Sequence, residues 1–305
     1  MNLKVKHILV VDDSRSVRVF FSDIFSKRSD YRAEFASSGE EAVEIFKNNH
    51  ISGKDRFDFV LTDINMPGLD GFATVEAIKK LDPNVKTGMI TGFNIDDYIK
   101  MALEKGIFNI ICKMDSPDEI IKTIDNLITG ENIFGIYSYL DPETPYKTIK
   151  VTRTDMLKAA ITEILEYSKD YLDEEKIYGL KTGLVEMGTN AIYHAYGYEK
   201  GSNVALKENE DVDIFYGIDK TKLVVLILDR SGSLSKEKVL GQLNKGVNPS
   251  PEDLLASGGR GIYLTRYLCD KVVVNIEKEK RTEVVLIMYF NKEYIESKPL
   301  LINQL

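Results

Sequence analysis

Five side chains in the first half of the chain have the types needed to place a phosphoryl group on a carboxylate. Asp12 and Asp13 follow the first apolar run, and Asp63 follows a later one, while Thr91 and Lys113 end two more. Converging carboxylates repel one another unless a cation neutralises them, and hard oxygen ligands of this kind suit Mg²⁺. The set predicts that Asp63 is the nucleophile, that Mg²⁺ and Lys113 offset phosphate charge, and that Thr91 donates a hydrogen bond.

These side chains converge only if the runs before them are neighbouring parallel strands. Short apolar runs alternate with helical patterns, which predicts an α/β domain with a doubly wound parallel sheet. Ligands of such sheets lie beyond the carboxyl ends of the strands. The expected strands are residues 7–11, 31–36, 57–61, 86–91 and 108–112, and the expected helices include 39–49, 70–81, 95–105 and one opened by Ser116 and Pro117.

The motifs of this half resemble the response-regulator receiver domain of two-component signalling, which has a flavodoxin-like fold. They are Val11-Asp12-Asp13-Ser14, the run Asp-Ile-Asn-Met-Pro-Gly-Leu-Asp-Gly at residues 63–71, Thr91-Gly92 and Lys113. The resemblance implies that Asp63 accepts a phosphoryl group from a cognate histidine kinase. It also implies that Asp13, Asp63 and the carbonyl of Asn65 hold Mg²⁺, with Asp12 in support.

Two positions depart from the receiver pattern. Ile110 stands three residues before Lys113, where the family often has an aromatic switch residue, and Met114 replaces the proline that usually follows the lysine. A signal from Thr91 is therefore expected to pass through residues 95–105 rather than through a swinging aromatic ring.

Polar residues of a different kind occur in three segments of the second half. Glu186 and Asn190 lie four residues apart on one face of a predicted helix, residues 174–196. Asp229 follows a predicted strand and precedes Arg-Ser-Gly-Ser. A glycine-rich loop, residues 257–261, opens a further helix, and such a loop offers backbone N–H groups and a positive dipole to phosphates.

The order of elements also changes in the second half. Paired strands, residues 212–218 with 223–228 and 272–277 with 283–289, accompany helices that follow one another. This order predicts an α+β fold with the helices on one face of a mixed sheet. Residues 130–146 sustain neither a helical nor a strand period, and they are expected to link a receiver domain at residues 1–129 to a second domain at residues 147–305.

In their order, the three polar segments resemble the GHKL ATPase sandwich, and within it the anti-sigma-factor type of serine kinase. Residues 186–196 look like that family's N box, and residues 258–270 look like its second glycine box. The resemblance implies that the domain binds ATP: Asn190 coordinates a second Mg²⁺, Glu186 acts as base and Asp229 reads the adenine amine. The other residues implied in nucleotide binding are Gly232, Gly259, Arg260 and Gly261.

The first glycine box of that family usually reads Asp-x-Gly-x-Gly, and here Ser231 and Ser233 replace both glycines. A backbone that needs positive φ at either position would be strained by serine.

The histidines exclude a different architecture, the hybrid histidine kinase. His7, His50 and His194 leave none for a separate dimerisation helix ahead of the ATPase segment.

Two classes of function stay open. In the first, the chain is a response regulator whose ATP-binding output phosphorylates Ser or Thr of a partner, such as an anti-sigma antagonist, under the control of Asp63. In the second, it is a partner-switching module that sequesters a sigma factor or an antagonist without ATP turnover. Ser231 and Ser233 favour the second, and Glu186 with Asn190 favours the first. ATP hydrolysis without a protein substrate, and a homodimer, are also left open.

Composition excludes several other classes of protein. The chain has 40 Lys plus Arg against 48 Asp plus Glu, a net charge of −8, so no basic domain is expected to bind nucleic acid. The longest apolar run, residues 284–290, is far below the roughly 18 residues that span a bilayer. Cys112 and Cys269 lack metal-ligand spacing. We expect a cytoplasmic protein with reduced thiols and no membrane partner.

Overall fold

The computed structural model describes residues 5–52, 56–130, 133–247, 249, 260–291 and 298–304 of the 305-residue chain. The chain divides into two compact units, Met1–Gly130 and Glu131–Leu305. None of the helices in the described ranges is both long and apolar enough to cross a membrane.

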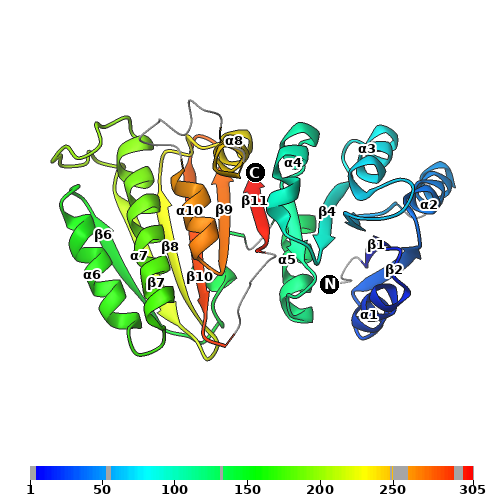
Figure 1. The fold of residues 1–305 in the computed structure, drawn as a ribbon, viewed down its shortest axis with the longest axis horizontal. Coiled ribbons are helices and arrows are strands. Elements are labelled where there is room, and N and C mark those ends of the chain that lie inside the picture. Colours follow the sequence, from blue (N-terminus) through cyan, green and yellow to red (C-terminus); the bar gives the residue numbers. More distant parts are fainter. Residues whose placement is uncertain are drawn as a thin grey trace. The chain divides into compact units, whose positions relative to one another are not determined.

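The described residues of the first unit form five parallel strands in the order β2-β1-β3-β4-β5 (Figure 1). This is the flavodoxin-like order of a doubly wound sheet, so the predicted fold is confirmed. The strands are β1 (Lys6–Val11), β2 (Tyr31–Ala36), β3 (Phe59–Asp63), β4 (Lys86–Thr91) and β5 (Asn109–Cys112). The helices are α1 (Arg15–Ser26), α2 (Gly39–Ser52), α3 (Gly71–Leu81), the 3-10 turn η1 (Ile95–Tyr98), α4 (Ile99–Lys105) and α5 (Pro117–Thr129).

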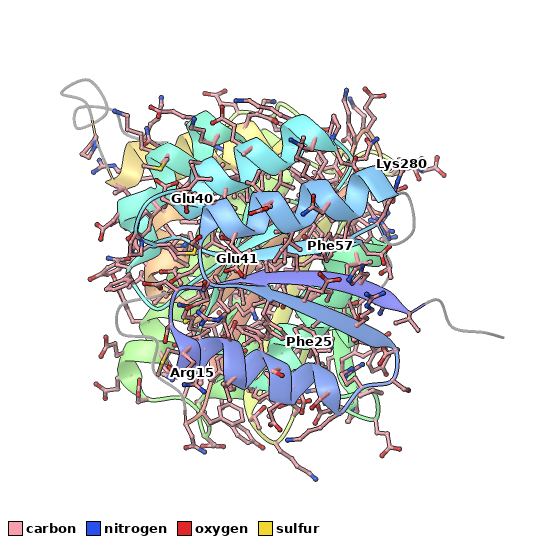
Figure 2. All side chains as sticks on the ribbon, turned by 90° about the vertical axis from the view of Figure 1, so that its right-hand side faces the viewer. Arg15, Phe25, Glu40, Glu41, Phe57 and Lys280 are labelled. Atoms are coloured by element: carbon pink, nitrogen blue, oxygen red, sulfur yellow. The ribbon has the colours of Figure 1, made fainter. Side chains whose placement is uncertain are left out.

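The strands β1 and β3 of this unit are buried on both faces. Figure 2 shows β1 and β2 between α1 and α2, with Phe25 on the α1 side and Phe57 on the α2 side. Phe25 packs against Tyr31 at 5.2 Å between ring centroids, and Phe57 stacks on Phe46 of α2 at 5.6 Å. Burial on both faces explains why β1 and β3 contain continuous apolar runs in the sequence.

Side-chain caps set the helix boundaries in the first unit. The Asp70 carboxylate accepts from the amide of Ala73 at 2.7 Å to open α3, and Ser116 accepts from Glu119 at 3.3 Å to open α5. Gly106 ends α4 at a φ of +64°. The single helix predicted over residues 95–105 is wrong, since a 3-10 turn precedes α4 there.

In the described part of the second unit, six strands lie in the order β11-β9-β10-β8-β7-β6. Its strand pairs are antiparallel except for the parallel pair of β9 and β11, so the predicted mixed sheet of an α+β domain is confirmed. The strands are β6 (Tyr146–Val151), β7 (Val212–Ile218), β8 (Lys222–Asp229), β9 (Lys271–Glu277), β10 (Arg281–Tyr289) and β11 (Leu300–Gln304), the last of which was not predicted. The helices are η2 (Ile136–Ser138), α6 (Met156–Ser168), α7 (Glu174–Thr189), the π-helical turn η3 (Asn190–His194), α8 (Lys236–Val247) and α10 (Gly261–Leu268).

The helices α6, α7 and α10 lie on one face of the second unit's strands (Figure 1). On that face, Tyr216 of β7 donates a hydrogen bond to Glu163 of α6 at 2.5 Å. Successive strand residues point to opposite faces. The next residue, Gly217, therefore points away from the helices, where a Cβ would lie 2.7 Å from a methyl carbon of Leu140.

Part of the segment expected as a linker lies on that opposite face. Ile133, Ile136 and Leu140 are all buried. Residues 133–140 therefore pack as part of the second unit, and β6 begins at Tyr146.

A glycine in α7 allows its close approach to α10 and provides a test of the fold. A Cβ at Gly179 would lie 2.7 Å from the carbonyl oxygen of Leu268, and backbone cannot move away cheaply. We expect Gly179→Ala to destabilise the second unit by about 1–3 kcal/mol in urea unfolding.

Gly241 of α8 is the matched control, because a Cβ there meets nothing within 4 Å. Gly241→Ala should stabilise the protein by about 0.5–1 kcal/mol through helix propensity. Equal stabilisation by both variants would contradict the close approach of α7 and α10.

Candidate functional site

Four of the predicted side chains meet at the carboxyl ends of β1, β3 and β5 in the first unit. Carboxylate oxygens of Asp12, Asp13 and Asp63 all lie within 4.8 Å of one another. Nζ of Lys113 lies 2.7 Å from Asp12 Oδ2 and 2.9 Å from Asp63 Oδ2. Asp63 is the last residue of β3 and is 5% exposed, so it sits at the centre of the group rather than on the surface.

Thr91 completes the group from the neighbouring strand. It ends β4, next to Ile90, which pairs with Asp63 in the strand register. Its buried hydroxyl accepts a hydrogen bond from the amide of Phe93 at 3.0 Å, so its own proton is left to be donated. The amide of Lys113 donates to the Thr91 carbonyl at 2.9 Å and ties the two strand ends together.

Burial and like charge make this group electrostatically unfavourable by itself. Burial raises the pKa of Asp63, the ammonium of Lys113 opposes the rise and the charge of Asp12 adds to it. Burial alone would lower the pKa of Lys113, but its ion pairs with Asp12 and Asp63 outweigh that effect and raise it. With all groups ionised, three carboxylates and one ammonium give −3 + 1 = −2, the charge that one divalent cation balances.

Magnesium fits the donors present. Oδ1 of Asp63 is buried and has no hydrogen-bond partner among the described residues. Hard carboxylate oxygens at short mutual distances are the ligands that Mg²⁺ prefers. Asp12, Asp13 and Asp63 would hold the ion, which would supply positive charge beside a phosphate.

Asn65 is placed differently from the carboxylates. Its side chain is exposed, and its amide nitrogen donates a hydrogen bond to the hydroxyl of Tyr98. The role of its carbonyl as a magnesium ligand stays a prediction.

The second unit brings together two of its predicted residues closely. A Cβ on Gly261, at the start of α10, would lie 2.4 Å from Glu186 Oε2 of α7, so only glycine allows this contact. Asn190 begins a π-helical turn in which its carbonyl accepts from the amide of Ala195 at 2.9 Å. The continuous helix predicted to Tyr196 is therefore wrong, and turns of this kind often occur at functional sites.

Asp229 ends β8 and is 7% exposed. Its Oδ1 accepts from the amide of Ser231 at 2.9 Å and from the Ser231 hydroxyl at 2.6 Å. Burial raises the pKa of Asp229, and the bonds from Ser231 oppose the rise. The backbone after Asp229 is held by Tyr196, whose hydroxyl accepts from the amide of Arg230 at 2.8 Å.

Neither Ser231 nor Ser233 has a positive φ, so the condition under which serine would strain the loop does not arise. The positive φ of this loop, +54°, is at Gly232. A Cβ on Gly232 would lie 2.5 Å from the carbonyl oxygen of Glu277, so this glycine packs against the β9–β10 turn.

The remaining predicted nucleotide residues have different outcomes. Arg260 is exposed and directly precedes α10. Gly259 lies outside the described residues.

Comparison with known proteins is consistent with these two sites. Residues 8–125 match the response regulator receiver domain, and residues 151–288 match the histidine kinase-like ATPase domain. Sporulation initiation phosphotransferase F of Bacillus subtilis is 31% identical over 113 residues, which are 37% of this chain and 86% of that protein. The chain belongs to the response-regulator receiver family. It is a receiver domain fused to a GHKL-type ATPase domain.

Two further relatives and one solved structure match segments of similar length. Chemotaxis protein CheY of Thermotoga maritima is 29% identical over 122 residues, 40% of this chain and 97% of that protein. Response regulator protein VraR of Staphylococcus saprophyticus is 31% identical over 127 residues, and the chain spans only 58% of its length. A receiver domain structure from Clostridium thermocellum is 27% identical, covering 41% of this chain and 95% of that one, with a TM-score of 0.37. Domains of the two matched families generally use Mg²⁺ and ATP.

Two residues of the receiver domain support the carboxylate site and were missed from the sequence. Arg18 of α1 donates from Nη1 to the carbonyls of Asp12 and Asp13, at 2.5 and 2.9 Å. Tyr98 of η1 contacts Asn65 and lies with its ring 6.3 Å from that of Phe72. A basic residue one turn into α1 was the available signal for Arg18, whereas Tyr98 had none.

The two departures from the receiver pattern can now be located. Ile110 is fully buried in β5, and the bond from Lys113 to Met114 is trans. Tyr98 lies within residues 95–105, the segment expected to carry the signal, and that route stays a prediction.

Thr282 is the residue missed in the GHKL domain. It pairs directly opposite Asp229 in the register of β10 with β8, and it is 3% exposed. Thr282 directly precedes the strand predicted at residues 283–289. It was missed because β10 begins two residues earlier, at Arg281.

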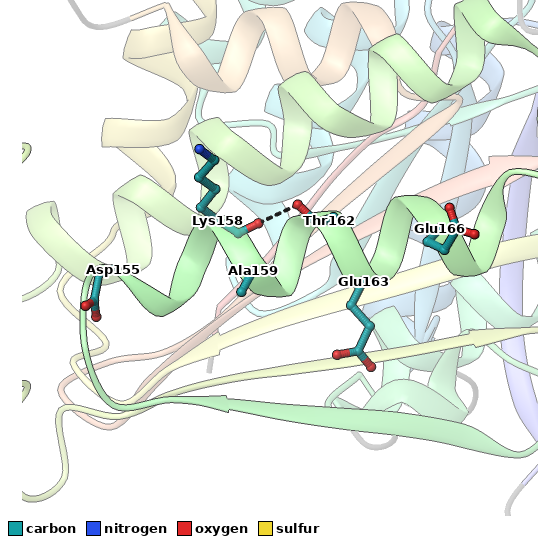
Figure 3. A pocket seen from close by; sticks show the side chains of 6 residues that line it. All are labelled: Asp155, Lys158, Ala159, Thr162, Glu163 and Glu166. Carbon is teal, nitrogen blue, oxygen red and sulfur yellow. Dashed lines mark hydrogen bonds between the residues drawn. The ribbon is translucent and has the colours of Figure 1, made fainter.

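A shallow groove lies elsewhere in the GHKL domain, along the exposed face of α6 (Figure 3). Its lining includes the carboxylates of Asp155, Glu163 and Glu166 and one ammonium, that of Lys158. A surface with this excess of negative charge repels phosphates, and it contains none of the predicted nucleotide residues.

The buried charge of Asp63 gives a test of the cation site. A carboxyl with a raised folded-state pKa contributes stability that is lost as the pH rises through that pKa, so ionised Asp63 destabilises the domain at pH 7. Without Mg²⁺, Asp63→Asn should raise the Tm of the receiver domain by roughly a few degrees. The gain should shrink as the pH falls and the wild-type carboxyl becomes protonated.

Added Mg²⁺ should raise the wild-type Tm by mass action and the Asp63→Asn Tm much less. Asp23→Asn, at an exposed pair with Lys27 on α1, is the control and should respond as wild type does. A response to Mg²⁺ of equal size in Asp63→Asn would exclude Asp63 as a ligand.

Proposed function

We propose that this chain is a cytoplasmic response regulator, phosphorylated on Asp63 by a partner histidine kinase, and that the state of Asp63 controls a nucleotide-binding output. The observation that carries the proposal is the placement of Lys113 Nζ within 2.9 Å of Asp63, while Oδ1 of the same carboxylate is left without a hydrogen bond among the described residues. Oδ1 is the oxygen that remains for a cation or for attack on phosphorus.

The group can accept a phosphoryl group from phosphohistidine. An oxygen of Asp63 attacks phosphorus, a P–O bond forms and the P–N bond to the imidazole breaks, which leaves an acyl phosphate on Asp63. Lys113 lies on the same carboxylate and can offset the new negative charge. The free proton of the Thr91 hydroxyl can be donated to a phosphate oxygen.

For the output, we propose ATP binding followed by phosphorylation of Ser or Thr on a partner protein, such as an anti-sigma antagonist. Glu186 is the proposed base, Asn190 the proposed ligand of a second Mg²⁺ and Asp229 the proposed acceptor for the adenine amine. The contact of Gly261 with Glu186 supports this role, because it brings the N-terminus of α10 beside the proposed base.

The second candidate is a partner-switching module that sequesters a sigma factor or an antagonist without ATP turnover. One observation favours it: Oδ1 of Asp229 is already occupied by the amide and hydroxyl of Ser231. Only Oδ2 is then left to read adenine. Either function is compatible with a monomer or a homodimer.

Phosphorylation is tested with a small phosphodonor. Acetyl phosphate with Mg²⁺ should add one phosphate to the chain, measured by intact mass, because Asp63 is the carboxylate in contact with Lys113. Asp63→Asn should lose the label. Asp13→Asn, which keeps the acceptor but loses a ligand oxygen, should label more slowly. Label retained by Asp63→Asn would exclude Asp63 as the acceptor.

Nucleotide binding separates the two candidate functions. Asn190→Ala and Asp229→Asn should each weaken ATP binding at least tenfold, about 1.4 kcal/mol, because metal coordination and adenine recognition are separate requirements. Equilibrium binding of labelled ATP with Mg²⁺ is the measurement, and Asn203→Ala at an exposed site is the control. If the wild type binds no ATP at millimolar concentration, the partner-switching function replaces the kinase.

A further inference from the structure

The residues between the two matched domains are attached to the sheet of the GHKL domain by specific contacts. We call residues 133–140 the clamp segment. The side-chain amide of Asn275 in β9 donates to the carbonyl of Ile133 at 2.6 Å and to the hydroxyl of Tyr139 at 2.7 Å. The Tyr139 hydroxyl donates to the same Ile133 carbonyl at 2.9 Å. Asn303 of β11 donates to the Asn275 oxygen at 2.9 Å and fixes the orientation of that amide.

Strand β10 makes the second set of contacts with the clamp segment. Glu283 accepts from the amide of Gly135 at 2.9 Å, and Arg281 lies 3.9 Å from the ring centroid of Phe134. Glu283 is 2% exposed. Glu283 and Asn275 are paired directly opposite each other in the sheet, so both point to the face that the clamp segment covers.

The residue between these two contacts points to the other face. Thr282 lies between Arg281 and Glu283 in β10, and it pairs opposite Asp229 on the helix side of the sheet. Strand residues alternate between the two faces of a sheet. Arg281 and Glu283 therefore contact the clamp segment, whereas Thr282 between them faces the proposed adenine site. Any tilt of β10 at this point changes the distance between Thr282 and Asp229.

The clamp segment also begins immediately after the receiver domain. The last receiver helix, α5, ends at Thr129 with Gly130 as its cap, and the contacts with the sheet start at Ile133. The attachment depends on hydrogen bonds as well as on buried side chains. Asn275 and Glu283 are bonded by the clamp segment when it is in place and would be hydrated by water if it moved away.

From this arrangement we infer that the clamp segment is a latch through which phosphorylation at Asp63 changes nucleotide binding at Asp229 and Thr282. This inference rests on the proposed function, because it requires both a phosphorylated receiver and a nucleotide-binding output. The latch holds β10 in one position in one state of Asp63 and releases it in the other. The upper limit of the effect is that of a typical coupling, roughly 5- to 150-fold in nucleotide affinity.

The test compares two tyrosines of the clamp segment in the full chain. Tyr139→Phe removes a hydroxyl bonded to Asn275 and Ile133, whereas Tyr137→Phe removes one from a side chain that is 49% exposed. Phe134→Ala removes the contact with Arg281. The affinity for a non-hydrolysable ATP analogue with Mg²⁺ is measured for each protein before and after treatment with acetyl phosphate.

In wild type, the affinities for the ATP analogue before and after treatment with acetyl phosphate should differ. Tyr137→Phe should show the same ratio of these two affinities as wild type. In the double variant Tyr139→Phe, Phe134→Ala, the two affinities should agree within twofold, while Asp63 still takes up one phosphate by intact mass. Hydrogen exchange of residues 133–140 in wild type should change on phosphorylation and should not change in Asp63→Asn.

Different outcomes separate the two proposals. If the double variant keeps the wild-type ratio, or if exchange of residues 133–140 does not respond to phosphorylation, the latch is wrong and the proposed function stands. If the wild type is phosphorylated but binds no nucleotide, the ATP-dependent output is wrong. The latch, which acts on nucleotide binding, is then wrong as well. A chain that takes up no phosphate at Asp63 overturns both.

Discussion

The contact of one ammonium with two carboxylates is the interaction on which the receiver domain depends. Parallel strands bring Asp12 and Asp63 to the same edge of the sheet, where their charges repel. Nζ of Lys113 lies within 2.9 Å of an oxygen from each, which offsets part of that repulsion. With Asp13 included, negative charge remains, and Oδ1 of Asp63 stays without a hydrogen bond among the described residues. A site with uncompensated buried charge is less stable than an apolar one, and it is suited to bind a cation and a phosphate.

The sequence was sufficient to predict the receiver fold and the centre of its site. Its strands β1 and β3 are buried on both faces and contain continuous apolar runs, and the carboxylates lie where those runs end. The supporting contacts of Arg18 and Tyr98 could not be predicted in this way. They join α1 and η1 to loops that are distant in sequence or irregular in backbone, and no periodic pattern describes such contacts.

The GHKL domain was predicted less completely, for related reasons. A π-helical turn changes the backbone at Asn190 without changing the spacing of apolar residues, so the sequence indicated one continuous helix. The clamp segment has no period of its own because two of its bonds use backbone groups, the carbonyl of Ile133 and the amide of Gly135. The serines of the first glycine box would strain the loop only if either position needed a positive φ. Instead, the positive φ is at Gly232, and the Ser231 hydroxyl bonds to Asp229.

The polar character of β10 explains how a covered sheet face could still be released. Burial raises the pKa of Glu283, the Gly135 amide and Arg281 oppose the rise, and an apolar residue at this position would bury its surface without such a penalty. An apolar contact would also favour the covered state strongly, because releasing it would expose that surface to water. A carboxylate and an amide are instead bonded in both states, by the clamp segment or by water, and the net difference per hydrogen bond is only about 1 kcal/mol. A phosphate at Asp63 can bias an equilibrium only by its differential free energy between two states. The hydrogen bonds of the clamp segment are therefore within the range that such a bias can shift, whereas exposing its buried Ile133, Ile136 and Leu140 would cost more.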